Sequence, residues 1–206
     1  MADSTRRWFG ASQTRTRIIE ATARAALEYG LRNMTVQHIL EQASLSRRTF
    51  YQHFRNKEEA ALGLYRSVSR ALVSEVRESM RKTTDPGRRL TAGLEAYVRF
   101  HQEVGELVAM LQTEAAPVDS ILAPLREETV DSLVSLVDKE VRESRGKALD
   151  PAIYRCLILG LDGLIIHHRA TNGRNADLGR IKRVVASLFT ATLAVAFDMP
   201  RADDAP

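Results

Sequence analysis

The 206-residue sequence predicts an all-helical protein. Apolar residues recur at the three- and four-residue spacing of helices from residue 14 to residue 197. No segment sustains the alternation of apolar and polar residues that is typical of strands. Residues that favour helix caps and turns separate the periodic segments. We therefore expect about nine helices in two domains.

The first three helices are short and closely spaced. An apolar face runs through residues 18–29, and Gly30 follows where a helix often ends in a left-handed residue. Thr35 is a favourable N-cap for a helix over residues 36–43. Ser46 offers a second cap only three residues after that helix ends. The sequence thus predicts two short helices with a tight connection.

Six further helices follow the same periodicity. Asn56 is placed to cap the first of them, and the acidic Glu58 and Glu59 favour its positive end. The ranges expected are 57–80, 88–102, 106–115, 122–144, 153–170 and 176–197. Residues 1–13 and 199–206 are predicted to be disordered tails.

The composition is typical of a soluble globular protein, with 44% hydrophobic and 27% charged residues. The single cysteine, Cys156, excludes an internal disulfide, and the polar N-terminus lacks the apolar centre of a secretory signal. No apolar run approaches the roughly 18 residues that cross a bilayer. We expect a cytoplasmic protein without a membrane span.

Positive charge is concentrated at the N-terminus. Residues 1–57 contain 10 Lys and Arg against 4 Asp and Glu, giving +6, whereas the remaining residues contain 20 against 22, giving −2. This asymmetry favours a segment that binds a polyanion, although a solvated basic face would have the same charge.

The segment from Ser44 to Tyr65 combines polar and aromatic residues in a helical register. On a helix beginning at Arg47, the rings of Phe50 and Phe54 share one face and can pack inward. The outer faces then carry Arg47, Arg48, Thr49, Gln52 and His53. Arginine can bind guanine edges or phosphates, and glutamine can pair with adenine. The pattern is typical of a helix that enters the major groove of DNA.

This segment closely resembles the DNA-binding signature of the TetR family of bacterial repressors. The residues that match it are Thr35, Ala43, Ser46, Thr49, Phe50, Tyr51, His53, Phe54, Lys57 and Glu58. The resemblance implies a helix-turn-helix DNA-binding domain at residues 1–57 and a helical effector-binding and dimerisation domain at residues 58–206. It also implies a recognition helix from Ser46 to His53, with phosphate contacts from Thr35, Thr49, Tyr51 and Lys57.

Two residues depart from the family pattern. Ser44 replaces the usual turn glycine and must tolerate a strained backbone angle, and Arg48 replaces a frequent glycine of the recognition helix. Arg6, Arg7 and Trp8 are compatible with a minor-groove arm and with a disordered tail.

The family resemblance implies a homodimer built from the last two helices. The apolar stripes expected at that interface comprise Ile153, Leu157, Gly160, Leu161, Leu164 and His168 on one helix, and Ile181, Val185, Leu188, Phe189 and Thr192 on the other. Burial within one subunit is the alternative.

Asp162 lies inside this apolar run and needs a hydrogen-bonding partner if it is buried. The adjacent His167 and His168 have poor geometry for one metal ion.

The resemblance also implies a small-molecule effector pocket, with no cofactor and no metal. Candidate lining residues are Tyr97, Phe100, His101, Met110, Glu114 and Cys156, because aromatic, sulfur-containing and isolated polar groups suit a mostly apolar cavity. For any single one of them, core packing is the favoured interpretation.

The sequence therefore predicts a dimeric, ligand-responsive transcriptional regulator, most often a repressor, that binds a palindromic operator in double-stranded DNA. A helical small-molecule enzyme and a protein-binding adaptor are the alternatives. The sequence contains no nucleophile with a positioned base and no glycine-rich phosphate loop, which disfavours the enzyme.

Overall fold

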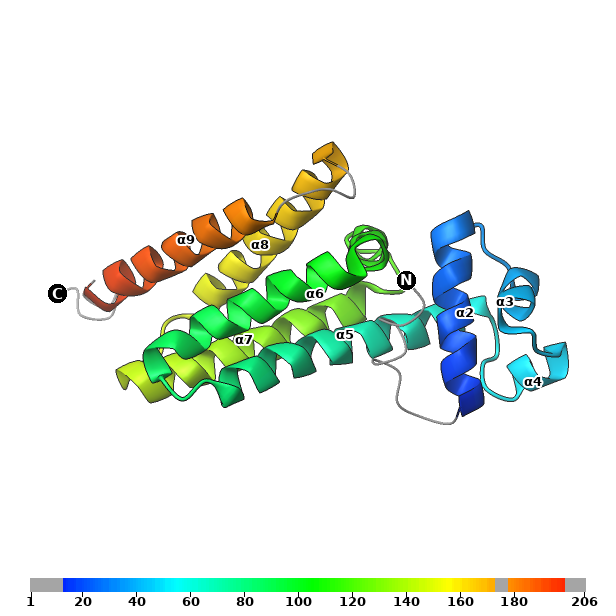
Figure 1. The fold of residues 1–206 in the computed structure, drawn as a ribbon, viewed down its shortest axis with the longest axis horizontal. Coiled ribbons are helices and arrows are strands. Elements are labelled where there is room, and N and C mark those ends of the chain that lie inside the picture. The colour runs from blue at the N-terminus through cyan, green and yellow to red at the C-terminus, as the bar shows by residue number, and fades with distance from the viewer. Residues whose placement is uncertain (1–12, 173–177, 199–206) are drawn as a thin grey trace. The chain divides into compact units, whose positions relative to one another are not determined.

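The computed structural model describes residues 13–172 and 178–198, and this part of the chain contains eight helices and no strands (Figure 1). The helices are α2 (Gln13–Tyr29), α3 (Val36–Ala43), α4 (Arg47–Tyr51), α5 (Lys57–Lys82), α6 (Pro86–Ala115), α7 (Ala123–Arg145), α8 (Pro151–Asn172) and α9 (Gly179–Asp198). The predicted all-helical fold is confirmed. Residues 1–12 and 199–206, including Arg6, Arg7 and Trp8, lie outside the described residues.

The chain forms two compact units. The first contains the residues up to Ser74 together with Phe100–Thr129, and the second contains Glu75–Arg99 and the residues from Val130 onward. The predicted domain boundary after residue 57 coincides with the first turn of α5. The division into a DNA-binding domain at residues 1–57 and an effector-binding and dimerisation domain at residues 58–206 stays a prediction.

Helix α6 contains both of the helices predicted at residues 88–102 and 106–115. It runs from Pro86 to Ala115, but Gly105 departs from helical dihedral angles, with φ 6° and ψ −79°, so two helical segments meet there at a kink. The kink lies between the two predicted ranges, and the predicted break is confirmed. Gly105 allows it because glycine has no side chain to restrict its backbone.

The predicted caps of the first unit are present. Gly30 has φ 76° and its N–H donates to the Ala26 carbonyl at 2.9 Å, which ends α2. The Asn56 side chain accepts a hydrogen bond from the Glu59 N–H at 2.8 Å and caps α5. Local sequence signals therefore set these helix ends.

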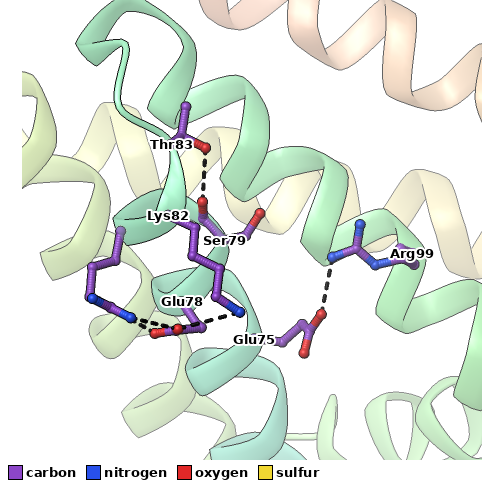
Figure 2. A network of polar contacts seen from close by, with 7 residues as sticks. Glu75, Glu78, Ser79, Lys82, Thr83 and Arg99 are labelled. Carbon is purple, nitrogen blue, oxygen red and sulfur yellow. Dashed lines mark hydrogen bonds and ion pairs between the residues drawn. The ribbon is translucent and has the colours of Figure 1, made fainter.

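Polar contacts connect the end of α5 to the first half of α6 in the second unit. The Ser79 hydroxyl donates to the Ala92 carbonyl at 3.0 Å. Arg99 forms an ion pair with Glu75 at 3.0 Å, as Figure 2 shows. On α5 itself, the hydrogen bond from Arg81 lowers the pKa of the Glu78 carboxyl to about 2. These contacts hold the two helices side by side along one face.

Asp162 is buried in the second unit, with 6% of its surface exposed. The Tyr97 hydroxyl on α6 donates a hydrogen bond to its carboxyl, which supplies the partner that the sequence required. Burial raises the pKa of Asp162 to about 7, because the ionised carboxylate loses its hydration.

We expect this carboxyl to make folding stability depend on pH. Between about pH 4 and pH 7 the unfolded chain releases the Asp162 proton while the folded chain retains it. Stability is therefore lost as the pH rises through this window. An Asp162→Asn variant should gain stability relative to the wild type from pH 4 to pH 7, as measured by urea unfolding. A difference in unfolding free energy that does not change with pH would contradict this assignment.

Candidate nucleic-acid interface and ligand cavity

Helices α2, α3 and α4 form a helix-turn-helix arrangement (Figure 1). Its core is apolar and buried. Ile18 of α2 and Ile39 of α3 are fully buried, as is Phe50 of α4. Phe54 follows α4 and is 2% exposed, and its ring centroid lies 6.0 Å from that of Phe50. The two aromatic rings thus attach the short α4 to its scaffold, as the register predicted.

The turn between α3 and α4 has a left-handed residue. Ser44 has φ 49° and ψ 50°, the conformation for which the family uses glycine, so the predicted strain at this position is confirmed. The Leu45 N–H donates to the Leu40 carbonyl at 3.3 Å, and Arg17 of α2 donates to the Ala43 carbonyl at 2.9 Å. These bonds satisfy the carbonyls at the end of α3.

Two predicted DNA-contact residues, Thr35 and Ser46, also cap helices. The Thr35 hydroxyl accepts from the His38 N–H at 3.2 Å, while Nδ1 of His38 accepts from the Thr35 N–H at 3.3 Å. Ser46 accepts from the Thr49 N–H at 3.1 Å, and the two hydroxyls lie 2.8 Å apart. Because each hydroxyl has further lone pairs, capping does not prevent a phosphate contact.

The recognition helix is shorter than the predicted range from Ser46 to His53. Helix α4 contains only five residues, Arg47–Tyr51, since Ser46 is its N-cap and Gln52 its C-cap. Arg47, Arg48 and Gln52 are exposed, and Tyr51 is 49% exposed. Thr49 and His53 are partly exposed. The structure therefore brings the predicted base-reading side chains to one accessible segment.

Lys57 has an intramolecular role that the sequence did not indicate. Its ammonium group donates to the carbonyls of Arg32 and Met34, at 2.7 and 2.9 Å. These bonds connect the first residue of α5 to the turn between α2 and α3. The predicted phosphate contact by Lys57 stays a prediction, and it would share the ammonium group with these carbonyls.

Several N-terminal arginines also have structural partners. Arg24 donates to the Gln42 carbonyl at 2.9 Å, Arg15 lies over the Phe54 ring at 4.9 Å, and Arg32 pairs with Glu114 at 3.2 Å. Part of the positive charge of residues 1–57 therefore has partners within the chain. The exposed Arg47 and Arg48 remain as the cations on the recognition helix.

A cavity of about 410 Å³ lies within the second unit. Its lining is mostly apolar and comes from α5, α6, α7, α8 and α9, with Val76, Leu94, Leu133, Leu161 and Phe189 among the side chains. Ser144, Arg145 and Thr190 add polar groups. This size and lining are typical of small-molecule sites.

Of the six predicted ligand residues, Tyr97 lines this cavity. Phe100 and His101 are buried in the other unit, Met110 is also in that unit, and Glu114 is engaged by Arg32. Cys156 is exposed on α8. These five residues are therefore not part of this cavity. The lining residues of α7 and α9 were missed, because their apolar spacing does not differ from that of ordinary core residues.

The predicted dimer residues divide between the interior and the surface. Leu161, Ile181 and Val185 are buried within the chain, as the alternative of burial within one subunit predicts. Phe189 also lines the cavity. Ile153, Leu157, His168 and Thr192 are partly exposed. Gly160 and Leu164 are exposed on one face of α8, and Val184 and Leu188 are exposed on one face of α9.

Neither a metal site nor a membrane span is evident in the described part of the chain. Within residues 13–172 and 178–198, no three His, Cys, Asp or Glu side chains are grouped so that they could hold a metal ion. None of the helices described here has the length and apolar character needed to cross a bilayer.

Comparison with solved structures identifies regulators with a similar fold. The fatty acid degradation regulator FadR of Bacillus halodurans superposes with a TM-score of 0.75 at 21% identity, covering 87% of this chain and 96% of that one. FadR of Bacillus subtilis, solved in complex with stearoyl-CoA, gives 0.72 at 20% identity, covering 84% and 95%. At these identities the likeness establishes the fold.

Sequence comparison connects the N-terminal domain to a family. The chain is 32% identical over 88 residues to the transcriptional activator FasR of Mycolicibacterium smegmatis, a match that spans 43% of this chain and only 40% of FasR. Residues 18–62 match the model of bacterial regulatory proteins of the tetR family, which describes regulators rather than enzymes. The N-terminal domain of this chain is therefore similar to those of the TetR family of bacterial regulatory proteins.

Proposed function

We propose that the protein is a cytoplasmic, dimeric transcriptional regulator that binds a palindromic operator through α4. The observation that carries this proposal is the exposure of Arg47, Arg48 and Gln52 on a short helix whose aromatic side is buried. That arrangement directs hydrogen-bonding side chains away from the scaffold, as entry into the major groove requires.

The exposed apolar residues of α8 and α9 support a homodimer. Leu164, Val184 and Leu188 are each at least 42% exposed, and a methyl group added at Gly160 or Gly163 would meet no atom within 4 Å. Apolar side chains around accessible glycines favour close approach of another helix. A two-fold dimer would present two copies of α4 to half-sites about 34 Å apart, or a multiple of that distance.

The cavity of the second unit supports a small-molecule effector with a long apolar portion. Its apolar walls would bury a hydrocarbon chain, and Arg145 would attract a negatively charged group. FadR of Bacillus subtilis was solved with stearoyl-CoA, so we propose an acyl thioester or a similar amphiphile for this chain. The effector would release the operator by binding the DNA-incompetent conformation more tightly. We propose that the protein represses transcription while it is bound to the operator, which a promoter fusion with and without the effector would test.

We expect two kinds of DNA contact to be separable by mutation. Arg47→Ala should relax base preference and reduce the binding free energy for the preferred operator by about 1–3 kcal/mol. Tyr51→Phe should instead weaken binding to every duplex, and by the same factor for each sequence. Mobility-shift titrations against a preferred and a scrambled operator would measure both. If Arg47→Ala left affinity and preference unchanged, the assignment of a base contact would be wrong.

The apolar face of α8 and α9 should control oligomeric state. Leu188→Glu would bury a carboxylate at the proposed interface and should convert dimers to monomers in sedimentation velocity. Val118→Glu is the matched control, since Val118 is 95% exposed in the other unit. A Leu188→Glu protein that sediments as a dimer would exclude this interface.

Filling the cavity should impair effector binding without affecting DNA binding. Leu94→Trp places a larger side chain in the lining, so the affinity for stearoyl-CoA measured by calorimetry should fall by about 10-fold or more. Val118→Trp adds the same bulk outside the cavity and should leave that affinity unchanged. Equal affinities for the two variants would place the effector elsewhere.

A further inference from the structure

A chain of three polar side chains joins α3 to the first residue of α4. The Arg47 guanidinium donates to Oε1 of Gln37 at 3.2 Å, and Nε2 of Gln37 donates to Oε1 of Glu41 at 2.9 Å. Arginine can only donate and an ionised carboxylate can only accept. The orientation of the Gln37 amide is therefore determined chemically, with its oxygen toward Arg47 and its nitrogen toward Glu41.

The backbone beneath these side chains is well fixed. Gln37 lies in the first turn of α3, behind the Thr35 cap, and Glu41 follows four residues later on the same face. Arg47 directly follows the Ser46 cap. The three side chains line one shallow hollow together with Leu40, Ser44 and Leu45.

Stability does not account for this chain of contacts. All three side chains are exposed to water, where hydrogen bonds and ion pairs between mobile groups contribute little to folding. These contacts matter more for the binding of Arg47 to DNA than for folding. A long side chain that is already held in place loses less conformational freedom when it binds.

We propose that Gln37 is a positioning residue for Arg47, held in its own orientation by Glu41, so that base preference at the site read by Arg47 depends on Gln37. This inference rests on the proposed function, in which Arg47 contacts a base edge. It adds a specificity determinant on α3, outside the recognition helix.

Selection of bound duplexes from a randomised operator library tests the proposal on the full-length protein. Gln37→Leu should lower base preference by about five-fold or more at the same base pairs at which Arg47→Ala lowers it. In a protein that already carries Arg47→Ala, Gln37→Leu should cause no further loss of preference. The double variant Gln37→Glu, Glu41→Gln keeps the same net charge. Its new carboxylate can accept from Arg47 and from the new amide, so wild-type preference should return.

The outcomes separate this inference from the proposed function. Failure of the wild-type protein to select any duplex would refute DNA binding itself. If the wild type selects an operator and Gln37→Leu leaves its preference unchanged, or alters base pairs that Arg47→Ala does not affect, the positioning role is wrong. Failure of the exchanged pair to restore preference would also overturn it. Thermal unfolding should show equal stability for all variants, because these side chains are exposed.

Discussion

Burial of Phe50 and Phe54 is the constraint on which the DNA-binding surface depends. A helix of five residues is too short to be stable by its own hydrogen bonds. The two rings bury almost all of their area, and the Ser46 side chain accepts a hydrogen bond from the Thr49 amide at the start of the helix. When the two rings face inward, the helical register places Arg47, Arg48 and Gln52 on the exposed side. The packing that stabilises α4 therefore also exposes its polar side chains.

Features set by local sequence were predictable. The caps at Thr35, Ser46 and Asn56 and the end of α2 at Gly30 follow from side-chain chemistry and backbone preference within a few residues. The resemblance at residues 35–58 added the role of α4, and the structure agrees with the geometry that this role requires. Ser44 shows that a non-glycine residue can occupy the left-handed turn when neighbouring hydrogen bonds hold it.

Features set by distant partners were not predictable. Apolar periodicity identifies which face of a helix avoids water, but not whether the same chain, a ligand or a second copy covers it. Leu161 and Phe189 were consequently assigned to a dimer face, whereas they line the cavity. Likewise, nothing near Lys57 in the sequence indicates that its ammonium group binds two carbonyls more than twenty residues away. Helix α9 shows how varied the environments of its apolar residues are. Val185 is buried, Phe189 lines the cavity and Leu188 is exposed.

The contacts of Lys57 have a mechanical consequence within the first unit. The ammonium group donates hydrogen bonds to two carbonyls of the short connection that precedes α3. Arg32, which lies in that connection, forms an ion pair with Glu114 of α6. A rotation or axial slide at the start of α5 would therefore pull this connection with it or break both hydrogen bonds. Both α5 and α6 therefore contact the short connection from which α3 starts, so a displacement of either helix at these residues would be transmitted to that connection.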